Sequence, residues 1–281
     1  MQRITTTAEL TRVIADAQTS HRSIGLVPTM GALHEGHLSL INRARKENDI
    51  VVVSVFVNPI QFNNPEDLAK YPRTVEADCE KIASVGADIA FVPTVEEMYP
   101  TPVQDTYHFG PLEEVMEGPR RPGHFSGVAV VVRRLFDLVK PQRAYFGEKD
   151  FQQIAIIRNL LKQIQYPIEL VSCPIVRADD GLALSSRNMR LSPEARAVAP
   201  KIYATLQEAV KRSESHEVED VKRFVLDTLQ SFGDFEPEYF EVVDDITLQP
   251  VQTWADAKGI VGCIAVWLDG VRLIDMVRFR G

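Results

Sequence analysis

Two histidines, His34 and His37, stand three residues apart where an apolar run gives way to a helical pattern. The run Ile24–Val27 is typical of a strand, and Leu38–Lys46 is typical of a helix. The start of a helix presents unpaired backbone N–H groups and a partial positive charge, and the imidazoles add further donors. Gly36 lets a flat ring or a phosphate approach the backbone. This combination favours a nucleotide held by its phosphates.

The same pair of histidines is compatible with other roles. A His-x-x-His pair also occurs in metal sites, but such a site needs further ligands, and none stands nearby at the usual spacing. Either histidine is also an ordinary residue of a surface or a core. The strand before the pair and the helix after it favour the nucleotide interpretation.

A second segment with polar chemistry is Gly147–Gln153, where a strand pattern ends and a helical pattern begins. Lys149 is a compact positive charge of the kind that binds phosphate, with a solvated loop lysine as the ordinary alternative. Gln153 lies in the first turn of the helix, from which its side chain can point into the same rim.

A third segment, Leu184–Arg187, follows the turn Asp179–Gly181. Its two hydroxyls and its guanidinium group form a donor set for an anion, with an exposed polar loop as the alternative. Because the segment lies at a domain boundary, we expect it to close over a bound nucleotide by swinging about Gly181.

Uncharged polar residues follow the apolar run Ile50–Val57. Asn58 and Gln61 stand among apolar residues, where amide side chains orient a small substrate. The Asn58-Pro59 pair is equally typical of a turn. Arg121 stands in a loop with Pro and Gly, and it offers either a partner for a substrate carboxylate or a charged surface turn.

Composition sets limits on the class of protein. The 281 residues are 45% hydrophobic and 25% charged, which fits a globular protein with a real core. No stretch of about 18 apolar residues predicts a membrane span, and the N-terminus lacks the apolar core of a signal peptide. The net charge of −8 disfavours a nucleic-acid surface. Three scattered cysteines, Cys79, Cys173 and Cys263, predict buried thiols in a reducing cytoplasm.

Strand and helix patterns alternate through the first part of the chain. Further strands are expected at Ile89–Val92, Ala144–Phe146 and Ile168–Val171, and helices at Val128–Val139 and Phe151–Ile164. The N-terminal residues read as the beginning of a helix capped by Thr6 and Glu9. Alternation of this kind predicts an α/β fold with a Rossmann-like, doubly wound parallel sheet, whose ligands bind at the carboxyl ends of the strands.

The remainder of the chain has a different pattern. Two helical stretches, Pro193–Arg212 and Val218–Phe232, precede strand-like runs, and Asp269-Gly270 is a strong hairpin signal. The runs are Tyr239–Val243, Ile260–Trp267 and Val271–Val277. We therefore expect residues 1–176 to form a nucleotide- and substrate-binding domain. Residues 177–281 should form a smaller α+β domain with an antiparallel sheet that acts as a lid.

A triphosphate carries more negative charge than Lys149 and Arg187 neutralise, because His34 and His37 are mostly neutral at pH 7. A divalent cation, Mg²⁺, is expected to supply the rest through phosphates and waters. Asp78 is a candidate for contact with that ion through water.

These segments together resemble one family, the pantothenate synthetases or pantoate–β-alanine ligases. Their order in the chain carries the resemblance: Pro28–His37, Phe56–Phe62, Tyr71–Thr74, Arg121–Gly127, Phe146–Gln153 and Asp180–Asn188. The resemblance implies that ATP and (R)-pantoate form pantoyl adenylate and pyrophosphate. β-Alanine then displaces AMP to give pantothenate. It also implies a homodimer. Where some relatives have two adjacent aspartates, this chain has Ala77-Asp78.

The resemblance also implies roles for individual residues. Gln61 and Gln153 would hold pantoate, and His37 would be the proton donor. His34, His37, Lys149, Ser185, Ser186 and Arg187 would contact phosphates. The whole ATP site would comprise Met30, Gly31, Ala32, Leu33, His34, Glu35, Gly36, His37, Gly147, Glu148, Lys149, Asp150, Val176, Leu184, Ser185, Ser186 and Arg187.

Two other functions fit part of this pattern. A nucleotidylyltransferase for a phosphorylated substrate would need more basic residues around its acceptor pocket, whereas Gln61 and Gln153 suit an uncharged hydroxy-acid body. A nucleotide sensor would have no need of these glutamines and would release no AMP. A fragment acting on tRNA is disfavoured by the negative charge.

Overall fold

The computed structural model describes residues 1–281, which form two compact units of more than one stretch each. Unit 1 comprises Met1–Phe109, Arg121–Gly147 and Ile156–Cys173. Unit 2 comprises Gly110–Arg120, Glu148–Ala155 and Pro174–Gly281. No helix is both long and apolar enough to cross a membrane.

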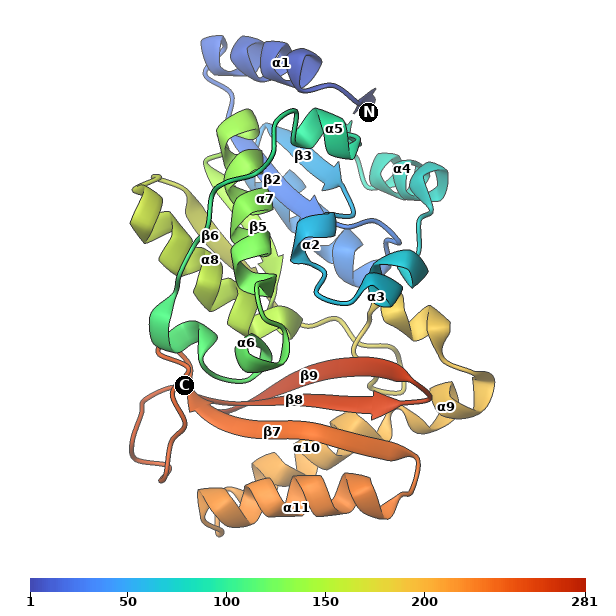
Figure 1. Cartoon of the computed structure of the whole chain (residues 1–281), viewed down its shortest axis with the longest axis vertical. Helices are drawn as coiled ribbons and strands as arrows, with labels where there is room; N and C mark the ends of the chain where they lie inside the picture. The colour runs from blue at the N-terminus through green and yellow to red at the C-terminus, as the bar shows by residue number, and fades with distance from the viewer. The chain divides into compact units, whose positions relative to one another are not determined.

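Unit 1 is built on a six-stranded parallel sheet (Figure 1), which confirms the doubly wound fold expected from the sequence. The spatial order is β1-β4-β3-β2-β5-β6. The strands are β1 (Gln2–Ile4), β2 (Ile24–Thr29), β3 (Ile50–Val55), β4 (Ile89–Phe91), β5 (Arg143–Gly147) and β6 (Glu169–Cys173). β3 and β4 follow β2 on one side of it, while β5 and β6 lie on the other. The order therefore reverses beside β2, and the carboxyl end of β2 is the place where such sheets bind ligands.

The N-terminal residues were expected to begin a helix, and this expectation is wrong. Gln2–Ile4 form strand β1, which pairs in parallel with β4, and the helix begins only at Thr7. The side chain of Thr6 does cap that helix by accepting a bond from the backbone of Glu9. A three-residue strand is too short to show a period, so its pairing with a distant strand decides its structure.

Helices cover both faces of the parallel sheet. α2 contacts β2, β3 and β5, and α4 packs beside α2. α7 contacts β2, and α1 packs against α7. The helices of unit 1 are α1 (Thr7–Thr19), α2 (Glu35–Glu47), α3 (Pro65–Lys70), α4 (Val75–Ser84), α5 (Val95–Met98) and α7 (His124–Val139), with a 3-10 turn η1 (Pro59–Gln61). Helix α8 (Phe151–Ile164) begins in unit 2 and continues in unit 1.

Unit 2 contains the predicted antiparallel sheet, in the order β7-β8-β9. Its strands are β7 (Phe235–Asp244), β8 (Ile260–Leu268) and β9 (Val271–Arg280). Asp269 and Gly270 join the last two with positive φ angles of 52° and 68°, as the hairpin signal predicts. The helical stretch Pro193–Arg212 is not one helix. It divides into α9 (Pro193–Val198) and α10 (Lys201–Arg212), because Pro200 lacks the N–H that a continuous helix needs.

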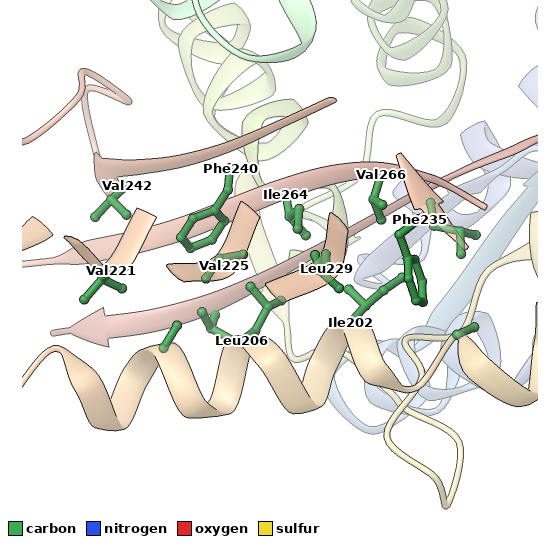
Figure 2. Close-up of a cluster of buried hydrophobic side chains, with 14 of the residues drawn as sticks. Ile202, Leu206, Val221, Val225, Leu229, Phe235, Phe240, Val242, Ile264 and Val266 are labelled. Carbon is green, nitrogen blue, oxygen red and sulfur yellow. The ribbon is translucent and has the colours of Figure 1, made fainter. Parts of the chain in front are cut away.

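One face of the antiparallel sheet packs on α10 and α11 (Val218–Ser231), as Figure 2 shows. The helices contribute Ile202, Leu206, Val221, Val225 and Leu229, and the sheet contributes Phe240, Ile264 and Val266. Each such apolar side chain contributes roughly 1.5–3 kcal/mol when it leaves water. The apolar side chains at helical spacing therefore hold both helices to the sheet.

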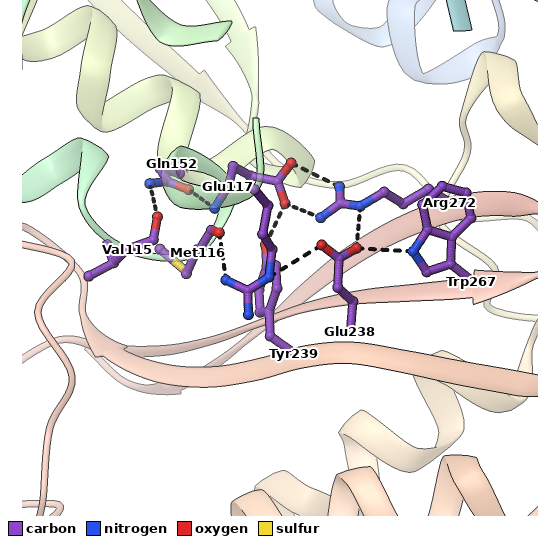
Figure 3. Close-up of polar contacts among 9 residues, drawn as sticks. Val115, Met116, Glu117, Gln152, Glu238, Tyr239, Trp267 and Arg272 are labelled. Atoms are coloured by element: carbon purple, nitrogen blue, oxygen red, sulfur yellow. Dashed lines mark hydrogen bonds and ion pairs between the residues drawn. The ribbon is translucent and has the colours of Figure 1, made fainter. Parts of the chain in front are cut away.

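The other face packs on chain segments that the sequence places in the first domain. These segments contain η2 (Gly110–Glu113), α6 (Glu117–Arg120) and η3 (Glu148–Asp150). Buried Glu117 accepts two bonds from Arg272, both at 2.8 Å, and one from the Tyr239 hydroxyl at 2.7 Å (Figure 3). Unit 2 thus gathers residues from three parts of the chain. A functional division at residue 176 stays a prediction.

Candidate active site

The loop that follows β2 has an unusual backbone. Gly31 and Ala32 both have positive φ angles, 82° and 51°. A Cβ at Gly31 would approach Asp78 Oδ2 to 3.0 Å and Val55 Cγ1 to 3.2 Å, so glycine fits this position best. Ala32 does carry a Cβ, and its left-handed backbone costs about 1–2 kcal/mol. The surroundings of the loop must supply that energy.

Helix α4 supplies it. Both oxygens of Asp78, which is fully buried, accept backbone bonds: Oδ2 from Ala32 at 2.9 Å and Oδ1 from Leu33 at 2.8 Å. The Thr74 hydroxyl donates to Oδ2 at 3.1 Å, and Lys81 Nζ donates to the carbonyl of Leu33 at 2.6 Å. Asp78 was expected to contact a metal through water. Its oxygens instead hold the loop, so we correct its role to a positioning residue.

The two histidines cap helix α2 reciprocally. His34 is the N-cap residue, and its Nδ1 accepts the backbone N–H of Gly36 at 3.1 Å. His37 Nδ1 accepts the backbone N–H of His34 at 3.3 Å, and the two ring centroids lie 4.1 Å apart. A ring nitrogen that accepts a bond carries no hydrogen, so this pattern assigns the hydrogen of each neutral ring to Nε2.

The expectation of unpaired backbone donors at this helix start needs correction. The N–H groups of Ala32 and Leu33 bind Asp78, and those of His34 and Gly36 bind the two imidazoles. These four backbone donors already have acceptors within the chain. A phosphate at this helix end would therefore meet the Nε2 side of the histidine rings in place of these amides.

Gln61 lies beside the same loop. Its Nε2 is 3.2 Å from the sulfur of Met30, and its Oε1 accepts a bond of 3.1 Å from Asn58 Nδ2. The backbone carbonyl of Gln61 contacts His124 Nδ1 at 2.9 Å. A Cβ at Gly127 would come within 2.7 Å of Gln61 Cα, so α7 packs closely against η1 there. The structure thus brings together the predicted Met30 and Gln61.

The side chain of Asn58, predicted to contact substrate, makes its hydrogen bonds within the chain. It is fully buried, and its Nδ2 donates to Gln61 and to the carbonyl of Gly127. Its Oδ1 accepts from the Tyr99 hydroxyl at 2.9 Å and from the backbone of Ile60. Burial raises the pKa of Tyr99, so its phenol stays a neutral donor. All four hydrogen-bonding positions of Asn58 are used, and we correct its role to one of orienting Gln61.

The second group of predicted residues lies in unit 2. Lys149 is part of η3, and its Nζ is 3.3 Å from a carboxylate oxygen of Asp150. The next turn begins α8, where Gln152 is buried. Its Oε1 accepts from the backbone of Glu117 at 3.0 Å, and its Nε2 donates to the carbonyl of Val115 at 2.9 Å (Figure 3). The same Nε2 also donates to the carbonyl of Leu112 at 2.8 Å. Partly exposed Gln153 follows on this anchored turn.

The predicted anion clamp follows a short hairpin. The backbone N–H of Leu184 donates to Val176 at 3.0 Å, and Arg177 and Ala183 form an antiparallel bridge. Ser185 is the N-cap of η4 (Ser186–Arg190), and its hydroxyl accepts the backbone N–H of Arg187 at 3.3 Å. Val176 and Leu184–Arg187, which the resemblance assigns to ATP, are therefore neighbours.

The proposed swing about Gly181 meets resistance from its contacts. A Cβ at this residue would lie 2.9 Å from the ring of Tyr203, and its carbonyl accepts a bond from Arg177. Asp180 accepts bonds from Arg196 and from the backbone of Leu182. Movement about Gly181 alone would break these bonds, so the turn is held to α9 and α10.

No group of three or more His, Cys, Asp or Glu side chains is arranged to hold a metal ion. The cysteines are free and buried, as expected, and burial raises the pKa of Cys263 to about 12. His34 and His37 therefore have no third ligand of these types arranged beside them, and burial disfavours the thiolate form of Cys263.

The predicted residues thus fall into two groups. Unit 1 holds Met30–His37 and Gln61, with Arg121 partly exposed just before α7. Unit 2 holds Glu148–Asp150, Gln153, Val176 and Leu184–Arg187, and Gly147 ends β5 in unit 1.

Sequence reasoning missed the positioning role of Asp78. A signal was available, since Asp78 stands three residues after Val75 and four before Ile82 and so shares their buried helix face. A carboxylate on an apolar helix face needs buried donors. Tyr99, His124 and Arg177 were also missed, because their partners lie far away in sequence.

Comparison with known proteins covers nearly the whole chain. The family model described as pantoate-beta-alanine ligase matches residues 2–278. The pantothenate synthetase of Bacteroides fragilis is 51% identical over 280 residues, which cover 100% of this chain and 99% of that protein. That of Phocaeicola vulgatus is 52% identical over 282 residues, with both chains fully covered.

Solved structures agree with these matches. The crystal structure of pantothenate synthetase from Thermus thermophilus is 43% identical, with a TM-score of 0.94 and both chains fully covered. Pantoate-β-alanine ligase from Francisella tularensis, complexed with beta-gamma ATP and β-alanine, is 34% identical with a TM-score of 0.83. That match covers 99% of this chain and 98% of the other.

Proposed function

Since the chain belongs to the pantoate–β-alanine ligase family, we propose that it joins (R)-pantoate to β-alanine through a pantoyl adenylate. A carboxylate oxygen of pantoate attacks the α-phosphorus of ATP, and the bond from that phosphorus to pyrophosphate breaks. The amine of β-alanine then attacks the acyl carbon, AMP leaves with the electrons of the acyl–oxygen bond, and the nitrogen loses a proton. The first step activates the carboxylate of pantoate, because the amine then displaces AMP, a good leaving group, in place of an oxide ion.

The observation that carries this proposal is the contact between Gln61 and Met30. The side-chain Nε2 of Gln61, which we propose as a pantoate ligand, lies 3.2 Å from that sulfur, beside the loop that leads to the N-terminus of α2. Gln61 is itself oriented by Asn58. A pocket that aligns a hydroxy acid with a phosphorus needs such preorganised polar groups. The Francisella tularensis relative, complexed with a form of ATP and with β-alanine, supports the same substrates.

The chain's cations and donors would bind the nucleotide. We assign the phosphates to His34, His37, Lys149, Ser185, Ser186 and Arg187, and the rest of the ATP site to Met30–Leu33, Glu35, Gly36, Gly147, Glu148, Asp150, Val176 and Leu184. The Nε2 hydrogen of His37 donates to the oxygen on which charge develops as pyrophosphate departs. Preorganised donors of this kind lower the barrier without a protein nucleophile.

The same residues indicate how pantoate and the metal ion would be bound. Gln61 and Gln153 hold pantoate, and Arg121 is the candidate partner for a substrate carboxylate. Because no carboxylate cage exists and Asp78 is committed to the loop, Mg²⁺ would be bound by the triphosphate and water. When bound, it would offset negative charge on the phosphates. We propose that residues 1–176 bind nucleotide and pantoate and that 177–281 form a lid, in a cytoplasmic homodimer.

Exchange of labelled pyrophosphate into ATP tests this proposal. The full-length protein is incubated with ATP, Mg²⁺ and labelled pyrophosphate, with pantoate present or absent and without β-alanine. The adenylate route predicts exchange only when pantoate is present. Absence of exchange, with no AMP formed after addition of β-alanine, would favour a nucleotide sensor. Exchange that needs a phosphorylated acceptor would favour a nucleotidylyltransferase.

A further inference from the structure

Strand β9 supports both of the nucleotide segments of unit 2. The η3 turn, which contains Lys149, and the η4 turn, which contains Arg187, each contact β9 although they are far apart in the chain. Asp275 lies on this strand and is only 4% exposed. A buried carboxylate at this place needs charged or polar partners.

Arg177 is the main partner of Asp275. Two parallel bonds join them, Nη1 to Oδ2 at 2.6 Å and Nη2 to Oδ1 at 2.8 Å. The same guanidinium donates to the carbonyls of Gly181 and Met276 and lies 3.5 Å from the ring centre of Tyr203. This fork geometry restricts both the position and the orientation of the arginine.

Arg177 is also part of the hairpin that precedes the clamp. It forms a bridge with Ala183, and the adjacent Val176 accepts the backbone N–H of Leu184. Its bond to the carbonyl of Gly181 closes the far end of the same hairpin. The bonds from Arg177 to Asp275 and Met276 of β9 therefore fix the position of the hairpin and, with it, of Leu184 at its end.

Lys149 interacts with the same carboxylate. Burial raises the pKa of Asp275 above its ordinary value, while Arg177 and Lys149 oppose that rise by their positive charges. Two cationic segments of unit 2, far apart in the chain, thus interact with one buried anion. Removal of either partner of the Arg177–Asp275 pair would leave the other buried without its counter-charge.

We propose that Asp275 and Arg177 are positioning residues for the nucleotide, because they hold the hairpin 176–184 and the clamp Leu184–Arg187 in a set place relative to Lys149. The inference rests on the proposed function for the identity of the ligand. Neither residue is assigned a contact with ATP. The pair acts by keeping two separate phosphate-binding segments in register, which lowers the ordering cost of binding.

Hydrogen exchange and ATP titration of the full-length protein test the inference. The variants are Arg177→Met, Arg177→Lys and Asp275→Asn. In Arg177→Met and Asp275→Asn we expect the amides of Ala178 and Leu184 to exchange at least about tenfold faster, and ATP to bind at least about tenfold more weakly by calorimetry. Arg177→Lys keeps the charge but not the fork, so it should fall between these variants and the wild type.

A matched control comes from the same sheet. Lys222 of α11 pairs with Glu241 of β7 at 3.0 Å, so Lys222→Met removes a cation without touching the hairpin. It should leave hairpin exchange and ATP affinity unchanged. Protection of the β8 amides reports whether each variant is folded. If Arg177→Met loses it, the comparison uses Arg177→Lys and Asp275→Asn.

The outcomes separate the inference from the proposed function. Unchanged hairpin exchange in the folded variants overturns the inference, and so does faster exchange with wild-type ATP affinity. Failure of the wild type to bind ATP or to exchange pyrophosphate overturns the proposed function. Faster hairpin exchange together with weaker ATP binding, in a protein that exchanges pyrophosphate, supports both.

Discussion

Replacement of Asp78 by asparagine is the sharpest test of how the histidine loop, the segment between β2 and α2 that leads to His34 and His37, is held. The carboxylate accepts two backbone bonds, at 2.9 Å from Ala32 and at 2.8 Å from Leu33, in a fully buried place. Asparagine keeps one acceptor oxygen, but its NH₂ group meets a backbone N–H that also needs an acceptor. One bond is lost, and two donors face each other.

The size of the effect follows from those contacts. A hydrogen bond to a charged group contributes roughly 1.5–3 kcal/mol, and a buried donor without an acceptor costs about 1–3 kcal/mol. We therefore expect Asp78→Asn to lower the free energy of unfolding by about 2.5–6 kcal/mol. Asp78→Ala removes the acceptor of both backbone bonds and of the Thr74 hydroxyl, so the loss should be larger than in Asp78→Asn. Because Ala32 needs these bonds to keep its positive φ, the loop should relax and ATP should bind more weakly.

Urea unfolding with linear extrapolation measures the first effect, and calorimetric titration with ATP measures the second. Glu76→Gln is the matched control, since Glu76 lies on the same helix but forms only an exposed ion pair with Arg3. Ala32→Gly should restore part of the stability of Asp78→Asn, because glycine adopts the same backbone without strain. Wild-type stability and ATP affinity in Asp78→Asn would refute the positioning role.

Three further substitutions test other contacts. His37→Gln keeps a capping acceptor at the third helical position but removes the imidazole, so adenylate formation should fall by about 10²-fold at near wild-type stability; an unchanged rate would remove His37 from the chemistry. Gln61→Ala should raise the KM for pantoate at least about tenfold while the KM for ATP changes little, and equal changes in both would contradict its assignment. Burial, together with its hydrogen bond to Glu47, raises the pKa of Tyr145 to about 12, so the wild type should lose stability as pH rises from about 10 to 12, because the unfolded phenol ionises first. Tyr145→Phe should lose less in alkaline urea titrations, and identical pH dependences would show that the phenol is not protected.

The parallel sheet is predictable because its strands have a strong local signal. The β-branched run at Ile50–Val55 and the Asp269-Gly270 turn each determine their structure with little help from distant residues. The sheet in turn predicts that the loops after β2 and β3 bind ligands, since ligands bind at the carboxyl ends of parallel strands. The family resemblance then supplies the substrates, which spacing alone leaves open.

What the sequence does not reveal depends on contacts between distant residues. Gln2–Ile4 become a strand only because β4 accepts them, and Glu117 joins unit 2 only because Arg272 and Tyr239 surround it. The same holds for the histidine loop. Its backbone donors appear available in the sequence, but Asp78, far along the chain, already occupies two of them. Hydrogen-bond partners of this kind require the tertiary structure.

The fate of a carboxyl oxygen tests the adenylate route most directly. Pantoate labelled with ¹⁸O in its carboxylate is turned over with ATP and β-alanine, and the AMP and pyrophosphate are analysed by mass spectrometry. Attack of the carboxylate on the α-phosphorus predicts one labelled oxygen in each AMP and none in pyrophosphate. Unlabelled AMP would contradict the pantoyl adenylate and, with it, the roles assigned to His37 and Gln61.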